Sequence, residues 1–185
     1  MGKHVEYRPE WVREDFIDFL AEKVNPLWAW KKAKARIVAK HHLSDDFVYI
    51  QLQPNHHFKA TDYQAGQSIL VTVLIAGVRW QRSYSIVEII ENGNLVIAVK
   101  QQGKVSNALT QQPVKSVVEI SQTQGEFVLK SQFHSALMIA SGSGITAIYA
   151  LIKAALKQPQ TVSYIDLIYF TRDDAFHAEL QQLTE

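Results

Sequence analysis

Hydrophobic residues recur in the first two thirds of the chain as short runs of β-branched and aromatic side chains, separated by polar turns. Such runs are typical of strands, and six of them in succession predict an antiparallel six-stranded Greek-key β-barrel. The turn at residues 91–94 contains Asn92-Gly93, a pair expected to supply the positive φ angles of a tight hairpin. A short helix is expected at residues 104–112. The six runs lie at residues 34–43, 47–53, 68–76, 79–87, 94–100 and 114–121.

The pattern changes after residue 132, where apolar strands alternate with segments of helical periodicity. This βαβα order predicts a parallel sheet. Two strands and two helices are too few to cover both faces of such a sheet, so a truncated α/β domain is expected at residues 132–185, after a barrel domain at 31–131. The predicted elements are a strand at 136–140, a helix at 145–157, a strand at 164–170 and a helix at 173–183.

An N-terminal extension at residues 1–30 precedes the barrel. Apolar residues recur in it at helical spacing after Pro9, which predicts an amphipathic helix over residues 9–24. Lysines follow at positions 31, 32 and 34. They favour a helix packed on the barrel with solvated lysines, and they leave open a patch that docks a partner or a membrane surface.

Composition narrows the functions that this chain can have. Of its 185 residues, 47% are hydrophobic and 20% charged, so it can bury the core of one medium domain or two small ones. The formal net charge of +1 gives no general attraction to nucleic acid, and no nucleic-acid partner is expected. The absence of cysteine excludes disulfides, thiolate zinc sites, cysteine nucleophiles and cysteine-ligated iron–sulfur clusters from this chain.

Two further features bear on location and on metals. The apolar run at residues 69–78 is much shorter than the ~20 residues that cross a bilayer, and the N-terminus lacks the apolar core of a secretory signal. We therefore expect a cytoplasmic protein.

Histidines occur as adjacent pairs at 41–42 and 56–57, but neighbours on a strand point to opposite faces, so no metal site is expected.

Residues Gly142 to Ala147, GSGITA, match the G-x-G-x-x-G/A fingerprint of dinucleotide sites and lie between a predicted strand and a predicted helix. Small residues there let the chain turn tightly, and the amides of the first helical turn can bind a pyrophosphate. A glycine turn that only packs a helix on a sheet is the alternative. Arg172 follows the next strand and would suit the 2′-phosphate of NADPH, whereas Asp173 and Asp174 would suit the ribose hydroxyl of NADH.

A second group of candidate residues lies in the barrel, at Arg82-Ser83-Tyr84-Ser85. Strand alternation places Arg82 and Tyr84 on one face and Ser85 on the other. A guanidinium beside a flat aromatic ring suits a ligand that has a ring and a phosphate. Downstream, Gly103-Lys104-Val105-Ser106 offers backbone amides and a hydroxyl at a predicted helix start, which is a second nest for an anion. Each feature alone is also common as an ordinary strand or helix cap.

The order of these strings resembles the ferredoxin–NADP reductase superfamily. The resemblance covers residues 34–185 and implies a flavin-binding barrel joined to a nicotinamide-binding α/β domain. Ala65-Gly66-Gln67, before a long strand, is also typical of that superfamily. The N-terminal part, NPLW leading into ARIV, looks closest to the reductase partners of bacterial fatty-acyl desaturases. The four strings are R-x-Y-S from Arg82, G-x-x-S-x-x-L from Gly103, G-x-F from Gly125 to Phe127, and G-x-G-I-T from Gly142.

The resemblance implies a role for each matching residue. Arg82, with Ser83 beside it, would hold the FAD pyrophosphate. Tyr84 would stack on the isoalloxazine ring and Ser85 would hydrogen-bond near flavin N5, so these two are the expected catalytic residues. The other expected contacts are backbone contacts of Val99 and Lys100 to the polar edge of the flavin, contacts of Gly103, Lys104, Val105 and Ser106 to the pyrophosphate, with Ser106 also using its hydroxyl, and contacts of Gly142, Gly144, Thr146 and Arg172 to the nicotinamide nucleotide.

The resemblance also implies electron transport, in which NAD(P)H reduces FAD by hydride transfer and the flavin passes single electrons to a carrier. That carrier would be a [2Fe–2S] protein, separate or in a missing C-terminal domain, and could serve a membrane desaturase. Two departures are Ala147 in place of proline and the lack of a late Cys-Gly-Pro segment, so the chain is expected to be a fragment or to need a separate carrier. A flavin-binding fragment without turnover and a β-barrel binding module are the alternatives.

Overall fold

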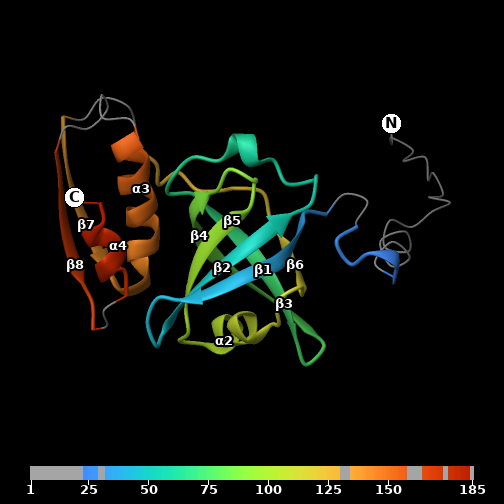
Figure 1. Ribbon diagram of the computed structural model, residues 1–185. Helices are drawn as coiled ribbons and strands as arrows, with labels where there is room; N and C mark the ends of the chain where they lie inside the picture. The colour runs from blue at the N-terminus through green and yellow to red at the C-terminus, as the bar shows by residue number, and fades with distance from the viewer. Residues whose placement is uncertain (1–22, 29–31, 130–133, 158–163, 173–174, 184–185) are drawn as a thin grey trace, which may run out of the picture.

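The computed structural model describes residues 23–28, 32–129, 134–157, 164–172 and 175–183. This part of the chain forms a β-barrel and a smaller α/β unit that lie side by side (Figure 1). Helix α3 (Ile145–Lys157) lies between the barrel and the two-stranded sheet of the α/β unit. The arrangement confirms the predicted fold class.

Six antiparallel strands close the barrel in the order β1-β2-β5-β4-β3-β6. Strand β6 lies beside β3 after the consecutive strands β3, β4 and β5, which is a Greek-key connection. The six predicted strands are confirmed with small shifts at their ends, and helix α2 (Lys104–Gln111) is found where a helix was expected. The remaining barrel elements are β1 (Lys34–His42), β2 (Phe47–Pro54), η1 (Ala60–Asp62), β3 (Ser68–Ile75), β4 (Val78–Ile89), β5 (Leu95–Lys100) and β6 (Val117–Ile120).

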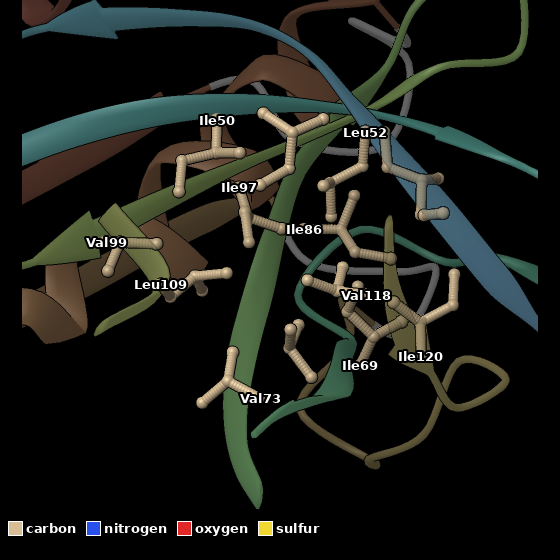
Figure 2. Packing of buried hydrophobic residues seen from close by; sticks show 14 of the residues in the cluster. Ile50, Leu52, Ile69, Val73, Ile86, Ile97, Val99, Leu109, Val118 and Ile120 are labelled. Carbon is tan, nitrogen blue, oxygen red and sulfur yellow. The ribbon is translucent and has the colours of Figure 1, made fainter. Parts of the chain in front are cut away.

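The barrel core consists of inward-pointing aliphatic side chains from all six strands. Figure 2 shows Ile50, Ile86 and Ile97 close together in this core, and all three are fully buried. Alternate residues of a strand point to opposite faces, so the remaining residues of each strand are left to pack on other elements or to face solvent. The core therefore fixes the strands on which the candidate site residues lie.

A two-residue hairpin joins β3 to β4 through Ala76 and Gly77. Both residues have positive φ, 50° and 77°, which is the pattern of a type I′ turn. At Asn92-Gly93 only Gly93 has a positive φ, 81°, so the expectation that both residues would adopt it was wrong. The side chain of Asn92 instead accepts a hydrogen bond from the backbone N–H of Asn94 at 3.0 Å, which closes a wider turn.

The α/β unit pairs β7 (Ser135–Ser141) in parallel with β8 (Tyr164–Phe170). A short 3-10 turn, η2 (Gly142–Gly144), leads from β7 into α3, as the strand-turn-helix prediction required. Helix α4 (His177–Gln181) is shorter than the predicted helix at 173–183, whose first two residues lie outside the described ranges. It starts after Phe176 because the φ of 68° at that residue is incompatible with a right-handed helix.

An aromatic cluster joins the α/β unit to the barrel. The ring of Phe176 is fully buried and makes edge-to-face contacts at centroid distances of 5.3 to 5.8 Å. A salt bridge between Lys153 of α3 and Glu88 of β4 crosses the same junction. The two units therefore share buried side chains. The rings around Phe176 are those of Phe47 and Tyr49 from β2 and Tyr149 from α3.

The outward face of the β7–β8 sheet is exposed in the described part of the chain and carries several large apolar side chains, with Asp166 opposite Leu137. Leu137, Ile139, Ile168 and Phe170 are 44–63% exposed there. Parallel sheets are normally covered on both faces, and the expectation of a truncated domain here stays a prediction. None of the described helices has the length and apolar character needed to cross a membrane.

The described end of the N-terminal extension is held against the barrel. Lys34 donates from Nζ to the carbonyl oxygens of Pro26, at 3.4 Å, and Trp28, at 3.3 Å. Only 6% of Lys34 is exposed, so the expectation of a solvated lysine was wrong at this position. Backbone carbonyls of the extension accept its protons, which makes burial of the ammonium possible. The predicted helix over residues 9–24 and Lys31 lie almost wholly outside the described residues.

Candidate functional site

A cavity of about 540 Å³ opens between the barrel and the α/β unit. Three walls enclose it: strand β4, the connection from β5 into α2, and the turn that leads into α3. Its size is in the range of small-molecule and cofactor sites, which occur preferentially between domains.

The first wall is the middle of β4, from Trp80 to Ser85. Trp80, Arg82 and Tyr84 share one face of the strand, and the two aromatic rings rest partly buried on the barrel core. Burial raises the pKa of the Tyr84 phenol to about 12, and the nearby Arg82 charge opposes part of this rise. Tyr84 is therefore a neutral aromatic surface at physiological pH, next to an exposed guanidinium. Ser83 and Ser85 border the cavity from the other face of the strand.

The second wall is the loop after β5 and the first turn of α2. The Ser106 hydroxyl organises this turn: Oγ accepts from the N–H groups of Gln102 at 3.2 Å and Gly103 at 3.1 Å, and donates to the Gly103 carbonyl at 3.0 Å. The first intrahelical hydrogen bond of α2 ends on that same carbonyl, so the N–H groups of residues 104–106 have no intrahelical acceptor. These amides and the positive end of the helix dipole can hold an anion. The Ser106 hydroxyl is engaged within the turn.

The cavity is strongly basic. Arg82, Lys100 and Lys104 line it, and none of its described lining residues is an acid. The formal net charge of the whole chain is only +1, so positive charge is concentrated at this place. Lys104 Nζ lies 4.5 Å from the centroid of the Trp80 ring, a cation–π contact. A concave surface of one charge sign attracts ligands of the opposite sign, here an anion.

The third wall belongs to the α/β unit and consists of Ser143, Gly144 and Thr146. These residues follow the carboxyl end of β7, the place where open α/β sheets bind ligands. Gly142 starts the turn with a φ of 51°, and the Tyr169 hydroxyl donates to its carbonyl at 3.4 Å. A Cβ atom added to Gly144 would meet nothing within 4 Å, so a ligand can approach the backbone closely here.

Together the walls suit a large ligand that carries an aromatic ring and a diphosphate. Trp80 and Tyr84 supply apolar faces, while Arg82, Lys104 and the first-turn amides of α2 supply donors for phosphate oxygens. FAD has both chemical features. The residues present therefore fit this cofactor.

The family described as oxidoreductase FAD-binding domain matches residues 34–129, just over half of the chain. The chain belongs to the oxidoreductase FAD-binding domain family. The match contains the β4 wall and the α2 turn, so two of the three cavity walls lie within this FAD-binding domain. It confirms the resemblance to the ferredoxin–NADP reductase superfamily and the expectation of FAD, but not the narrower likeness to reductases of desaturases.

Relatives of the FAD-binding domain are similar over most of this chain. A flavohemoprotein from Burkholderia sp. (strain TH2) is 28% identical over 168 residues, which cover 89% of this chain and 42% of the relative. An NADH-cytochrome b5 reductase 1 from Cryptococcus neoformans var. neoformans is 28% identical over 144 residues, which cover 76% and 48%. The solved structure of phthalate dioxygenase reductase gives a TM-score of 0.67 at 26% identity and covers 80% and 47%. The chain spans less than half the length of each of these proteins.

The structure brings most of the predicted site residues to one cavity, from positions far apart in the sequence. Arg82 on β4 and the α2 turn face the same space, as binding of one diphosphate by both requires. The roles expected of these residues toward FAD and NAD(P)H stay predictions. The predicted residues that line the cavity are Arg82, Ser83, Tyr84, Ser85, Lys100, Gly103, Lys104, Val105, Ser106, Gly144 and Thr146.

Three predicted residues do not line this cavity. The side chain of Val99 is fully buried in the barrel core because strand alternation turns it inward, and its expected backbone contact to a flavin stays a prediction. Gly142 is the first residue of the turn, and the cavity lining starts at the next residue, Ser143. Arg172 follows β8, and since β7 and β8 are parallel with Ser141 opposite Phe170, it lies at the same sheet edge as the glycine turn.

Four further residues line the cavity without having been predicted. Ser143 lies within the Gly142–Ala147 motif and Gln102 directly precedes Gly103, so their positions next to predicted site residues could have identified both. Trp80 precedes Arg82 by two residues, and the period of two along a strand could have placed it on the same face. Ala98 carries no chemical signal. The four are Trp80, Ala98, Gln102 and Ser143.

Proposed function

We propose that this protein is an NAD(P)H-dependent flavin oxidoreductase that passes electrons from NAD(P)H through FAD to a one-electron carrier. The single observation that carries the proposal is the shared cavity, lined both by the FAD-binding domain and by the glycine turn of the α/β unit. Hydride transfer requires donor and acceptor rings to be held in contact, which adjoining sites allow. The names of the relatives, NADH-cytochrome b5 reductase and phthalate dioxygenase reductase, agree with this class of reaction.

When bound, FAD supplies the redox chemistry, accepting a hydride and releasing electrons one at a time. The side chains of this chain bind and orient. Arg82 and the first-turn amides of α2 would hold the diphosphate through charge-assisted hydrogen bonds. Tyr84 offers a neutral aromatic face, and the Ser85 hydroxyl offers a hydrogen bond at the same wall. No side chain has to act as an acid, a base or a nucleophile.

The electron acceptor is a narrower part of the proposal. The chain contains no cysteine, so an iron–sulfur carrier of the usual cysteine-ligated type must come from another protein or another domain. The structure of phthalate dioxygenase reductase is described as passing electrons from pyridine nucleotides to [2Fe-2S], which supports such a carrier here. The further proposal that this carrier serves a membrane fatty-acyl desaturase rests only on the resemblance of the N-terminal part to the reductase partners of such enzymes.

The test is the visible spectrum of the purified chain after incubation with FAD and removal of unbound cofactor. A yellow protein that bleaches under anaerobic NADPH or NADH supports the proposal. A colourless protein contradicts it and favours a β-barrel binding module. Arg82→Gln is the matched variant, since it keeps a polar side chain on β4 but removes the charge that faces the phosphate, and it should retain much less FAD.

A second candidate is an FAD-binding protein without turnover. It is favoured by one observation: in the described residues the α/β unit contributes only Ser143, Gly144 and Thr146 to the cavity, and Arg172 lies outside it. A yellow protein that neither NADPH nor NADH bleaches would support this second candidate over the first.

A further inference from the structure

Trp80 lines the cavity, yet the proposed function gives it no task. It shares one face of β4 with Arg82 and Tyr84. Its indole Nε1 is shielded from solvent and has no hydrogen-bond partner within the described ranges. Because Nε1 is inaccessible to solvent, only the ring of Trp80 is available to the cavity.

Lys104 lies directly over the same ring, with Nζ 4.5 Å from the ring centroid. Lys104 is the first residue of α2, whose first turn contains no acidic residue. A cation at this end of a helix is repelled by the helix dipole, which places partial positive charge there. The cation–π contact with Trp80 offsets that repulsion. The Lys104 ammonium and the positive end of α2 lie close together, and an anion bound between them would be attracted by both.

We propose that Trp80 is a positioning residue for the phosphate-bearing part of FAD, an inference that rests on the proposed function. Its ring holds the Lys104 ammonium at the cavity wall, where that charge can meet the diphosphate. Arg82 comes from β4 and Lys104 from α2, so a diphosphate between them meets positive charge from two walls. Trp80 on β4 thereby fixes the position of a basic residue that belongs to α2.

A purely structural role is the rival explanation, because the Trp80 ring also packs against the barrel core. The two explanations differ in ligand dependence. A structural defect on β4 would weaken every flavin ligand, whereas a lost phosphate contact weakens only ligands that carry phosphate. FAD and riboflavin share the isoalloxazine ring and differ in this respect.

The experiment measures dissociation constants of FAD and riboflavin by calorimetry for the full chain and five variants. The variants are Trp80→Leu, Trp80→Phe, Lys104→Gln, the double variant Trp80→Leu with Lys104→Gln, and Trp28→Leu as a control. Trp28 is an exposed tryptophan outside the cavity, so its replacement should leave both constants unchanged. Far-ultraviolet circular dichroism checks that each variant is folded.

We expect Trp80→Leu and Lys104→Gln each to weaken FAD binding about tenfold, the size of one charge-assisted contact, and to change riboflavin binding less than about twofold. The double variant should be close to either single variant rather than about a hundredfold weaker, because Trp80 acts through Lys104. Trp80→Phe keeps an aromatic face for the Lys104 ammonium and should stay closer to wild type than Trp80→Leu.

Equal losses for FAD and riboflavin, or a fully multiplicative double variant, would overturn the role of Trp80 as a positioning residue. Unchanged FAD affinity in Trp80→Leu would do the same. In each of these cases the wild-type chain still binds FAD and the proposed function stands. A wild-type chain that binds no FAD would overturn both proposals together.

Discussion

Gly66, in the loop before β3, is the position where one methyl group should do most damage. Its φ is 93°, and a Cβ atom added there would lie 1.9 Å from the carbonyl oxygen of Phe127 and 2.9 Å from the Leu151 side chain of α3. The first obstacle is backbone, which cannot rotate away as a side chain can. Gly66→Ala therefore forces the segment around Phe127 to move, together with the loop that precedes β3.

The cost has two parts. A side chain at positive φ costs about 1–2 kcal/mol, and overpacking against a fixed neighbour adds about 1–3 kcal/mol. We therefore expect Gly66→Ala to lower the free energy of unfolding by about 2–5 kcal/mol. That is a large share of the about 5–15 kcal/mol that stabilises a typical domain.

Gly125→Ala is the matched control. Gly125 has a similar φ of 108°, but a Cβ atom added there would meet nothing within 4 Å, so only the backbone cost of about 1–2 kcal/mol applies. Urea unfolding followed by far-ultraviolet circular dichroism gives both free energies. If the two variants lose the same stability, the steric part of the argument is wrong.

Three further outcomes are expected. Ser85→Ala should slow flavin reduction by NAD(P)H about tenfold or more in stopped-flow absorbance with FAD still bound, and an unchanged rate would remove Ser85 from the mechanism. Arg172→Gln should raise the KM for NADPH about tenfold while that for NADH changes little, and equal changes would argue against 2′-phosphate recognition. Because burial raises the pKa of Tyr84 from 10.0 to about 12, its contribution to stability is complete below pH 10 and is lost as pH rises towards 12. Tyr84→Phe should lessen this alkaline loss in urea unfolding, and an identical loss in the variant would contradict the assignment.

The fold followed from the sequence because its signals are local. Periodicity and β-branched composition located the strands, and glycine placed the turn into α3. The failures were equally physical. Ala76 adopts a positive φ that alanine disfavours, so composition pointed to Asn92-Gly93 for the tight hairpin. The buried position of Lys34 depends on carbonyl groups of a separate segment, and a lysine in a polar run gives no sign of that.

The candidate site was predictable where short strings carry the chemistry. Arg82 and the α2 turn were named from such strings, and the structure places them on facing walls of one cavity. Trp80 was not predicted as a site residue because a tryptophan in a strand usually belongs to the core. Its proposed role depends on a contact with Lys104, which is distant in sequence. The internal use of the Ser106 hydroxyl was also missed, since a serine near a helix start can serve either the turn or a ligand.

The buried ring of Phe176 has a consequence for how a nucleotide reaches the cavity. Separating the α/β unit from the barrel would strip this ring of its neighbours on β2 and expose it to water. Wide opening between the two units is therefore costly. If the proposed function holds, a nicotinamide coenzyme would have to enter the cavity by small side-chain movements and not by slow motions of whole domains.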